Sequence, residues 1–415
     1  MRIKAIILAA VFAASICGCT KQSDRSGYPQ EEFVLVYYCA GFNNLSSDIK
    51  HNLHVMESGT IPFRTSKHKL LAFTHFSVND VNFTDLTESH LVHISNNYGQ
   101  IQRDTLLTID KTRSASDAAV LEEVLEKVAR LYPNAHYGLV VSSHGTGWLP
   151  AGKYSSGNYI QFRRKPQGGS LPVYKYNANP DEPKVKTFGA EVEIKDGVKY
   201  SREMTIQSMA AAIPIHLDYL LFDACLMGGI EVAYEFKDVA DKVAFSPTEV
   251  LSEGFDYSDI SDLLSDSPSI DVFCKRYFDY YDKSARERSA TISVVKTSGL
   301  DALAQTCGKL FNNYRSSIAG LNTASGIQRY YRSDHHWFFD LRDILFKAGI
   351  SSTDLTELDA ALDGCISYKA ATPSFLGIQI TSYSGLSMYL PSVGDSDLNE
   401  FYKTLAWNKA TNLVE

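Results

Sequence analysis

Buried strands that alternate with amphipathic helices constrain this chain more than any other feature of its sequence. The stretch FVLVYYCAG at 33–41 is a run of β-branched and aromatic residues that ends in glycine, which is typical of a strand buried on both faces. Comparable apolar runs follow at 69–78, 137–145, 216–225 and 242–247, a weaker one lies at 91–94, and a late strand is expected at 383–391. Parallel strands need helical connections, so this pattern predicts an α/β/α sandwich with a mostly parallel central sheet.

Helical patterns fill the spaces between these runs. From Ser116, a candidate N-cap, an apolar stripe continues to Pro133, which cannot extend a helix. Further helices are expected at about 201–212 and at 227–236, the latter directly after Cys225. The one helix between runs 137–145 and 216–225 permits a right-handed crossover. We therefore expect these two strands to be neighbours in the sheet.

The length of 415 residues and an ordinary composition, 44% hydrophobic and 21% charged, indicate a large globular protein with a sizeable core. We expect a catalytic α/β domain at 32–265, with an irregular insertion at 149–187 that is rich in proline, glycine and basic residues. The pattern becomes mixed beyond it. A smaller C-terminal α+β region at 266–415 is therefore predicted to pack on the first domain.

The N-terminus has the organisation of an export signal. Arg2 and Lys4 precede an apolar stretch too short to span a bilayer, and Gly18-Cys19 ends it. This resembles a bacterial lipoprotein signal at 1–18, which implies a lipidated Cys19, a flexible tether at 19–31 and anchoring in the cell envelope. The alternative is an ordinary secretory signal that is cleaved nearby.

Charge and cysteine spacing argue against several classes of partner. The net charge is −8 and no long basic run occurs, which argues against nucleic acid. The cysteines show no C-x-x-C spacing, which argues against a zinc site. The stretch SDHHWFFDLRD brings four possible metal ligands close together, His335, His336, Asp340 and Asp343. Its pattern is, however, typical of the polar start of an amphipathic helix. We predict no metal and no cofactor.

Candidate chemistry follows two of the strands. His144 comes just after run 137–145 and Cys225 after run 216–225, and ligands of open parallel sheets bind outside the carboxyl ends of the strands. A buried core thiol is the ordinary interpretation of Cys225 alone. The expected pairing with His144, each beside glycine, favours a nucleophile and its acid–base partner instead.

This pairing specifies a mechanism. A nearby imidazole and the start of the following helix would both favour a thiolate at Cys225. The backbone N–H groups of Gly145 and Cys225 are the natural donors of an oxyanion hole, since Gly145 has no side chain to block approach. His144 would then protonate the leaving amine.

The stretches SSHGTGW and FDACLMGG resemble the His-Gly and Asp-Ala-Cys motifs of the clostripain family of cysteine peptidases, relatives of gingipains, caspases and legumains. The blocks VLVYYCAGFNNLSSDI, SPTEVLSEGFDY and GLSMYLP resemble the family too, so the likeness covers nearly the whole mature chain. One departure is Ser143, where relatives often have Asp or Asn. The resemblance implies a caspase-like fold, a His144–Cys225 dyad and cleavage of peptides after Arg or Lys.

The resemblance also implies that Asp223 contacts the basic side chain in the S1 pocket. Its other interpretation is a cap on the following helix. Family members include self-cleaved zymogens, and basic residues of the insertion are available for such cleavage: Lys153, Arg163, Arg164 and Lys175. Some relatives depend on calcium, but no EF-hand loop occurs here. Two alternatives stay open: a non-catalytic surface lipoprotein that binds a partner, and a transpeptidase or ligase that uses the same dyad.

Overall fold

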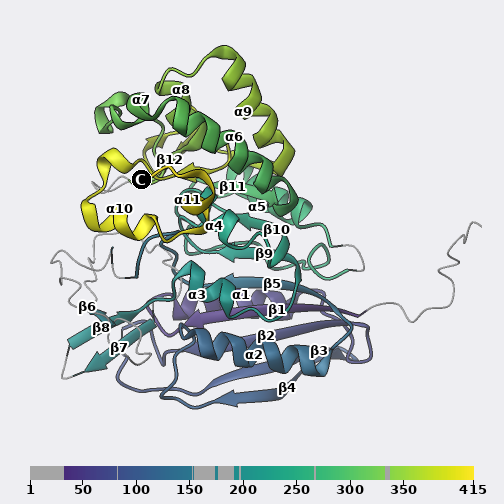
Figure 1. Cartoon of the computed structure of the whole chain (residues 1–415). Helices are drawn as coiled ribbons and strands as arrows, with labels where there is room; N and C mark the ends of the chain where they lie inside the picture. The colour runs from purple at the N-terminus through teal and green to yellow at the C-terminus, as the bar shows by residue number, and fades with distance from the viewer. Residues whose placement is uncertain are drawn as a thin grey trace, which may run out of the picture. The chain divides into compact units, whose positions relative to one another are not determined.

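A nine-stranded sheet organises the protein (Figure 1). The structure, a computed structural model, describes residues 32–81, 83–151, 153, 173–175, 191–195, 198–265, 268–331 and 337–415. From one edge to the other, the strands are β13 (Ile366–Ala371), β11 (Thr291–Lys296), β10 (Ala240–Phe245), β9 (Leu217–Asp223), β5 (His136–Ser142), β1 (Phe33–Gly41), β2 (His68–Phe76), β3 (Ser89–Asn97) and β4 (Gln100–Ile109).

The middle of this sheet is parallel and its two edges are antiparallel. β10, β9, β5, β1 and β2 run in the same direction, whereas β3 on one side and β11 on the other run opposite to them, and the outermost strands β4 and β13 are in turn antiparallel to β3 and β11. β11 and β13 come from beyond residue 265, so the predicted catalytic and C-terminal regions contribute to one sheet. The predicted α/β fold with a mostly parallel sheet is confirmed.

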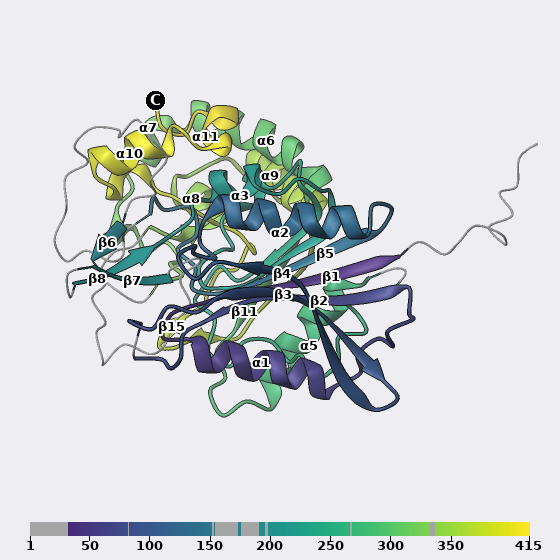
Figure 2. The same cartoon turned by 90° about the horizontal axis from the view of Figure 1, so that it is seen from below.

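Helices cover both faces of the sheet (Figure 2). α1 (Ser46–Ser58) and α5 (Ile270–Lys283) pack on one face, and α2 (Ala118–Leu131), α3 (Ile206–Ala211) and α4 (Ile230–Glu235) pack on the other. The second layer continues into the C-terminal helices, which are α6 (Leu300–Asn313), α7 (Arg315–Ala319), α8 (Leu341–Lys347), α9 (Ser352–Cys365), α10 (Ser396–Tyr402) and α11 (Ala406–Thr411). Within the described part of the chain, every helix is too short or too polar to cross a membrane.

Strand β1 explains why helices cover the sheet on both faces. All nine of its residues are buried, as the apolar run 33–41 predicts. Val36 and Tyr38 point into the core under α2, whereas Leu35 and Tyr37 point into the core under α1 and α5. Because side chains alternate along a strand, a strand covered on both sides must be apolar at every position.

Helix α2 confirms the predicted apolar stripe, because Val120, Leu121, Val124, Leu125 and Val128 are all buried. The predicted cap is wrong. The helix begins at Ala118 after Asp117, and no side chain caps it.

Two expected strands differ in length from the prediction. The short apolar run at 91–94 extends to the full length of β3, which forms a hairpin with the unpredicted β4 through Tyr98 and Gly99, both of positive φ. The late strand expected at 383–391 shortens to β16 (Ser387–Met388), which pairs with β12 (Phe339–Asp340). A second short pair joins β14 (Ser374–Phe375) to β15 (Ile378–Gln379).

A separate small sheet combines one strand of the predicted insertion 149–187 with two strands that follow it in the sequence. It contains β6 (Val173–Lys175), β8 (Val198–Arg202) and β7 (Glu191–Lys195), with β8 in the middle and all pairs antiparallel. The backbone N–H of Val192 donates to the carbonyl of Phe42 at 2.9 Å, which ties β7 to the carboxyl end of β1. The segment that follows the insertion is therefore held near the carboxyl end of β1.

Candidate active site

The structure brings His144 and Cys225 to adjacent positions at the carboxyl ends of two central strands of the sheet. β5 and β9 are parallel neighbours, and their paired residues end with Ser142 opposite Asp223. His144 and Cys225 each lie two residues beyond that last pair. The two predicted site residues therefore follow neighbouring strand ends, as the crossover argument requires.

Gly145 packs directly on the backbone of the cysteine. A Cβ atom at this position would lie 2.2 Å from the carbonyl oxygen of Cys225 and 2.9 Å from its nitrogen, so any side chain there would displace the loop. Gly147 has a φ of 61° and also lies close to the cysteine loop, since a Cβ there would be 2.6 Å from the carbonyl oxygen of Leu226. The two glycines allow the histidine loop and the cysteine loop to touch along their backbones.

His144 is oriented by a residue that the sequence analysis did not select. Its Nε2 lies 2.7 Å from Oδ1 of Asn44, in the loop between β1 and α1. An amide oxygen only accepts, so Nε2 carries the proton and Nδ1 is the basic nitrogen of the neutral ring. Asn44 follows the carboxyl end of β1, the strand next to β5, and the strand-end rule that selected His144 and Cys225 could have found it as well.

Cys225 is closed off from solvent, with 1% of its surface exposed. The backbone N–H of Val250 donates to Sγ at 3.0 Å, and the carbonyl oxygen of the same residue lies 3.5 Å from Sγ. Two backbone hydrogen bonds hold the segment after β10 in this position. The N–H of Leu226 donates to the carbonyl of Thr248 and the N–H of Gly228 to that of Ser246, both at 2.8 Å. A substrate carbonyl can reach the sulfur only after this segment moves.

The helix after Cys225 begins later than predicted. The expected start was Met227, but α4 begins at Ile230 because residues 226–228 bond to the segment after β10 instead of to a first helical turn. Leu226 also has a φ of 59°, which is outside the helical region. Val250, and not a helix N-terminus, therefore supplies the N–H group that meets the sulfur.

Asp223 is completely buried between the sheet and the segment that follows β10. Its Oδ2 accepts hydrogen bonds from the hydroxyls of Ser142 at 3.0 Å and Tyr257 at 3.3 Å. Burial, and then the nearby Asp223 carboxylate, raise the pKa of Tyr257 well above its ordinary value. The capping interpretation is wrong, because α4 begins after Gly229 and has no side-chain cap.

Among the basic residues proposed as self-cleavage sites, the structure describes the side chain of Lys153. Its ammonium group lies 2.6 Å from Asp395 and over the ring of Trp337, and 11% of the side chain is exposed. Lys175 is in β6, of which the backbone is described. Arg163 and Arg164 lie outside the described residues.

Other predicted residues fall outside the described part of the chain or have structural roles. The signal, Cys19 and the tether belong to the first group, as do His335 and His336. Asp340 caps α8 through the N–H of Asp343, and also accepts from Tyr330 at 2.6 Å. No cluster of three or more metal-ligating side chains occurs among the described residues.

Fold and site together define a cysteine protease of the caspase-like architecture. A sequence model of the clostripain family, peptidase family C11, matches residues 195–408, more than half of the chain. The chain therefore belongs to the clostripain family. The matched segment includes Asp223 and Cys225 and begins after His144.

Solved structures share this fold. An inactive zymogen C11 protease from Parabacteroides distasonis is 27% identical, covers 93% of this chain and 99% of its own, and has a TM-score of 0.72. A secreted C11 cysteine protease from Bacteroides thetaiotaomicron, iotapain, shares the fold at 21% identity, with 92% and 100% coverage and a TM-score of 0.70. A secreted C11 protease of the same organism in complex with an irreversible peptide inhibitor has a TM-score of 0.69 at 21% identity, with 92% and 99% coverage. Comparison with curated proteins finds no significant match.

Proposed function

We propose that this cysteine protease is an endopeptidase that cleaves after Arg or Lys, with Cys225 as nucleophile and His144 as acid–base partner. The observation that carries the proposal is the direct contact of the His144-Gly145 backbone with Cys225 at adjacent strand ends.

The reaction follows from the groups at this edge. His144 takes the thiol proton of Cys225, the resulting thiolate adds to the carbonyl carbon, and the N–H groups of Gly145 and Cys225 stabilise the oxyanion. His144 gives its proton to the leaving amine, and a thioester forms as the peptide bond breaks. Water, deprotonated by His144, then hydrolyses the thioester and releases the acid and the free thiol. An amine in place of water would give the transpeptidase alternative.

The proposed specificity rests on Asp223. A buried carboxylate next to the nucleophile complements a guanidinium or ammonium group. Ser142 and Tyr257, which donate hydrogen bonds to it, do so through neutral hydroxyls. Tyr257 and the residues that cover Cys225 belong to the same segment after β10. Movement of this one segment would therefore uncover both groups.

We further propose that the chain is made as a latent precursor. Its sulfur is enclosed, and the structure resembles a relative described as an inactive zymogen. Cleavage in the insertion, after Lys153, Arg163, Arg164 or Lys175, would free the segment between β5 and β9. We also propose a lipid anchor at Cys19 and a place in the bacterial cell envelope, and one relative is described as secreted.

Peptide reporters with Arg, Lys, Asp or Asn at P1, the residue whose carbonyl is attacked, test this function. We expect turnover of the Arg and Lys reporters by the wild type and a loss of at least about 10³-fold in Cys225→Ala. The matched control is Cys274→Ala, which removes another buried thiol, on α5, and should stay active.

Two outcomes would contradict the proposal. Turnover of the Asp or Asn reporters alone would overturn the specificity, and turnover of none would favour the non-catalytic binding protein. The same two proteins test self-cleavage: the wild type should split within the insertion on incubation, and Cys225→Ala should stay whole.

A further inference from the structure

The carboxylate of Glu191 is buried and has no part in the mechanism proposed above. Glu191 is the first residue of β7, and 2% of its surface is exposed. Its Oε1 lies 2.6 Å from Nδ1 of His75, while its Oε2 accepts from the N–H of Ala115 at 2.9 Å and from the hydroxyl of Ser114. Burying a carboxylate is costly unless its charge is paired and hydrogen-bonded, and these three partners meet both conditions.

His75 carries the opposite charge. A carboxylate only accepts hydrogen bonds, so Nδ1 of His75 holds a proton. Burial lowers the pKa of His75, but the charge and hydrogen bond of Glu191, with a bond to the backbone of Thr87, raise it overall. The two side chains therefore form a buried ion pair. Removal of either member would leave the other charge buried without its partner.

Phe42 connects this ion pair to the turn at 42–45 between β1 and α1, which we call the Asn44 turn. The ring of Phe42 stacks on the imidazole of His75, with centroids 4.9 Å apart and 15° between the ring planes. Its carbonyl accepts from the N–H of Val192, the residue after Glu191, at 2.9 Å. The side chain and the backbone of Phe42 are thus both held by the ion pair and by the strand that carries its carboxylate.

The Asn44 turn also carries the residue that orients His144. Asn44 is two residues after Phe42, and its Oδ1 lies 2.7 Å from Nε2 of His144. The turn is bonded internally, because the N–H of Leu45 donates to Oδ1 of Asn43 at 2.9 Å. A turn that is closed by such a bond moves largely as a unit. A shift of Phe42 would therefore also shift Asn44.

We infer that Glu191 is a positioning residue for the reaction: with His75 it fixes the Asn44 turn and thereby the orientation of the His144 imidazole. This inference rests on the proposed function and adds a residue from beyond the insertion to it. Glu191 follows every proposed cleavage site in the sequence, whereas His75 and Ser114 precede them. In a cleaved molecule, the ion pair would therefore connect one chain to the other.

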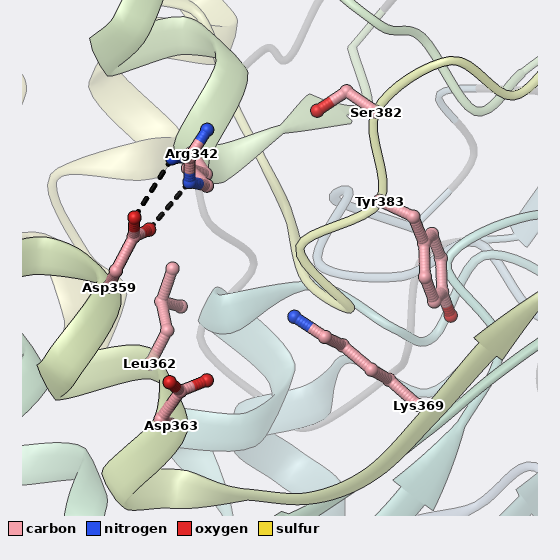
Figure 3. A pocket seen from close by; sticks show the side chains of 7 residues that line it. All are labelled: Arg342, Asp359, Leu362, Asp363, Lys369, Ser382 and Tyr383. Atoms are coloured by element: carbon pink, nitrogen blue, oxygen red, sulfur yellow. Dashed lines mark hydrogen bonds and ion pairs between the residues drawn. The ribbon is translucent and has the colours of Figure 1, made fainter. Parts of the chain in front are cut away.

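A second ion pair provides the comparison (Figure 3). Asp359 on α9 accepts two hydrogen bonds from Arg342 on α8, at 2.5 and 2.8 Å, beside a cavity of about 370 Å³. This cavity is lined in part by edge strand β13, and in the sheet β5 and β9 lie between β13 and β1. Asp359→Asn therefore removes a carboxylate from an ion pair that is distant from the Asn44 turn.

A double-mutant cycle on the full chain tests the inference with Asn44→Ala and Glu191→Gln. Each single change should lower kcat for the reporter with Arg at P1 about tenfold and leave KM within twofold, because His144 acts in the transition state whereas Asp223 binds P1. Since Glu191 acts through Asn44, Glu191→Gln should cost less than about a further twofold when Asn44→Ala is already present. Asp359→Asn is the matched control and should keep the wild-type kcat.

A second variant covers the case in which Glu191→Gln folds poorly. In His75→Gln the amide can still donate to Glu191 but cannot stack on Phe42 as the imidazole does, so kcat should again fall about tenfold with little change in KM. This loss should also disappear in the presence of Asn44→Ala.

The orientation of His144 can also be measured without turnover. In protein labelled with ¹⁵N-histidine, the Nε2–H of His144 that donates to Asn44 should give a downfield proton resonance. We expect Asn44→Ala to abolish this resonance, Glu191→Gln and His75→Gln to shift or broaden it, and Asp359→Asn to leave it unchanged.

Three outcomes decide between the possibilities. A full tenfold further loss from Glu191→Gln in the presence of Asn44→Ala would show that Glu191 does not act through the turn, and would overturn the inference. A normal resonance and a normal kcat in both Glu191→Gln and His75→Gln would overturn it as well. A wild type that cleaves no reporter would instead contradict the proposed function, and the resonance would still decide whether Glu191 positions His144.

Discussion

Two buried carboxylates flank Cys225 in the sequence and differ in the hydrogen bonds that they accept. Asp223, two residues before the cysteine, accepts from the side-chain hydroxyls of Ser142 and Tyr257. Glu231, six residues after it, accepts from the N–H of Tyr389 at 2.8 Å and the hydroxyl of Tyr402 at 2.7 Å, both at Oε1. Its Oε2 is buried and makes no hydrogen bond to any described residue.

The partners show that the two carboxylates have different roles: the one proposed to recognise substrate is Asp223, and the one that joins parts of the fold is Glu231. Asp223 accepts a hydrogen bond from Tyr257, which belongs to the segment that covers the nucleophile. Movement of that segment can therefore expose Asp223. Glu231 joins α4 to two residues of the C-terminal part of the chain, and burial raises its pKa to about 7 in spite of the bonds from Tyr389 and Tyr402. Both groups are fully buried. Burial alone therefore does not identify the carboxylate that acts on substrate.

The largest expected effect is that of Asp223→Asn on catalysis. The amide keeps the shape of the carboxylate but loses the charge that would pair with Arg or Lys. We expect kcat/KM for reporters with a basic P1 residue to fall at least about 100-fold, by the usual cost of removing one partner of a buried charge pair. Glu231→Gln is the matched change and should stay within about threefold at pH 6. Equal losses in both variants would show that the two carboxylates do not differ in their contribution to catalysis.

Glu231→Gln is expected to change stability instead. The pKa of Glu231 is about 7 in the folded protein against 4.5 for the ordinary group, so its carboxyl favours folding when protonated. As pH rises from 4.5 through 7, Glu231 ionises in the unfolded chain before it does so in the folded protein. The wild type should therefore lose up to about 3 kcal/mol of stability by pH 8. The variant should lack this loss. Urea unfolding of both proteins at pH 5 and pH 8 measures it, and parallel pH dependences would contradict the assignment.

The smallest effects are expected from the tyrosines that bond the two carboxylates. Tyr402→Phe removes the 2.7 Å bond to Glu231, and should cost about 2 kcal/mol at pH 8 and less at pH 5, because hydrogen bonds to charged groups are stronger. Tyr257→Phe removes the longer bond of 3.3 Å to Asp223 and should cost about 1 kcal/mol. Urea unfolding at the two pH values compares them. A larger cost at pH 5 than at pH 8 for Tyr402→Phe would be inconsistent with an ionising Glu231.

The sequence predicted features that depend on local pattern and on rules of strand order. β1 occupies the expected residues 33–41, and the crossover argument placed His144 and Cys225 on neighbouring strands. Both results follow from apolar periodicity and from the handedness of parallel connections, which neighbouring residues largely determine.

Features that depend on distant contacts were missed. Asn44 meets His144 across 100 residues of sequence, and Val250 meets Cys225 across 25. α4 starts three residues late because the segment after β10 takes the backbone N–H groups of Leu226 and Gly228. No local pattern shows that an extended segment returns to cover the nucleophile, so enclosure of Cys225 could be seen only in three dimensions.

The ladder between β5 and β9 has a consequence for the reversibility of unfolding. All proposed cleavage sites lie between these strands in the sequence, so a cleaved molecule consists of two polypeptides joined by the paired residues of β5 and β9 and by the shared core. Intact, the chain refolds by a unimolecular reaction at a rate independent of concentration. Once cut, its two pieces must find each other by diffusion, so dilution alone would oppose recovery. The cleavage proposed to release activity would thus also make each unfolding event harder to reverse.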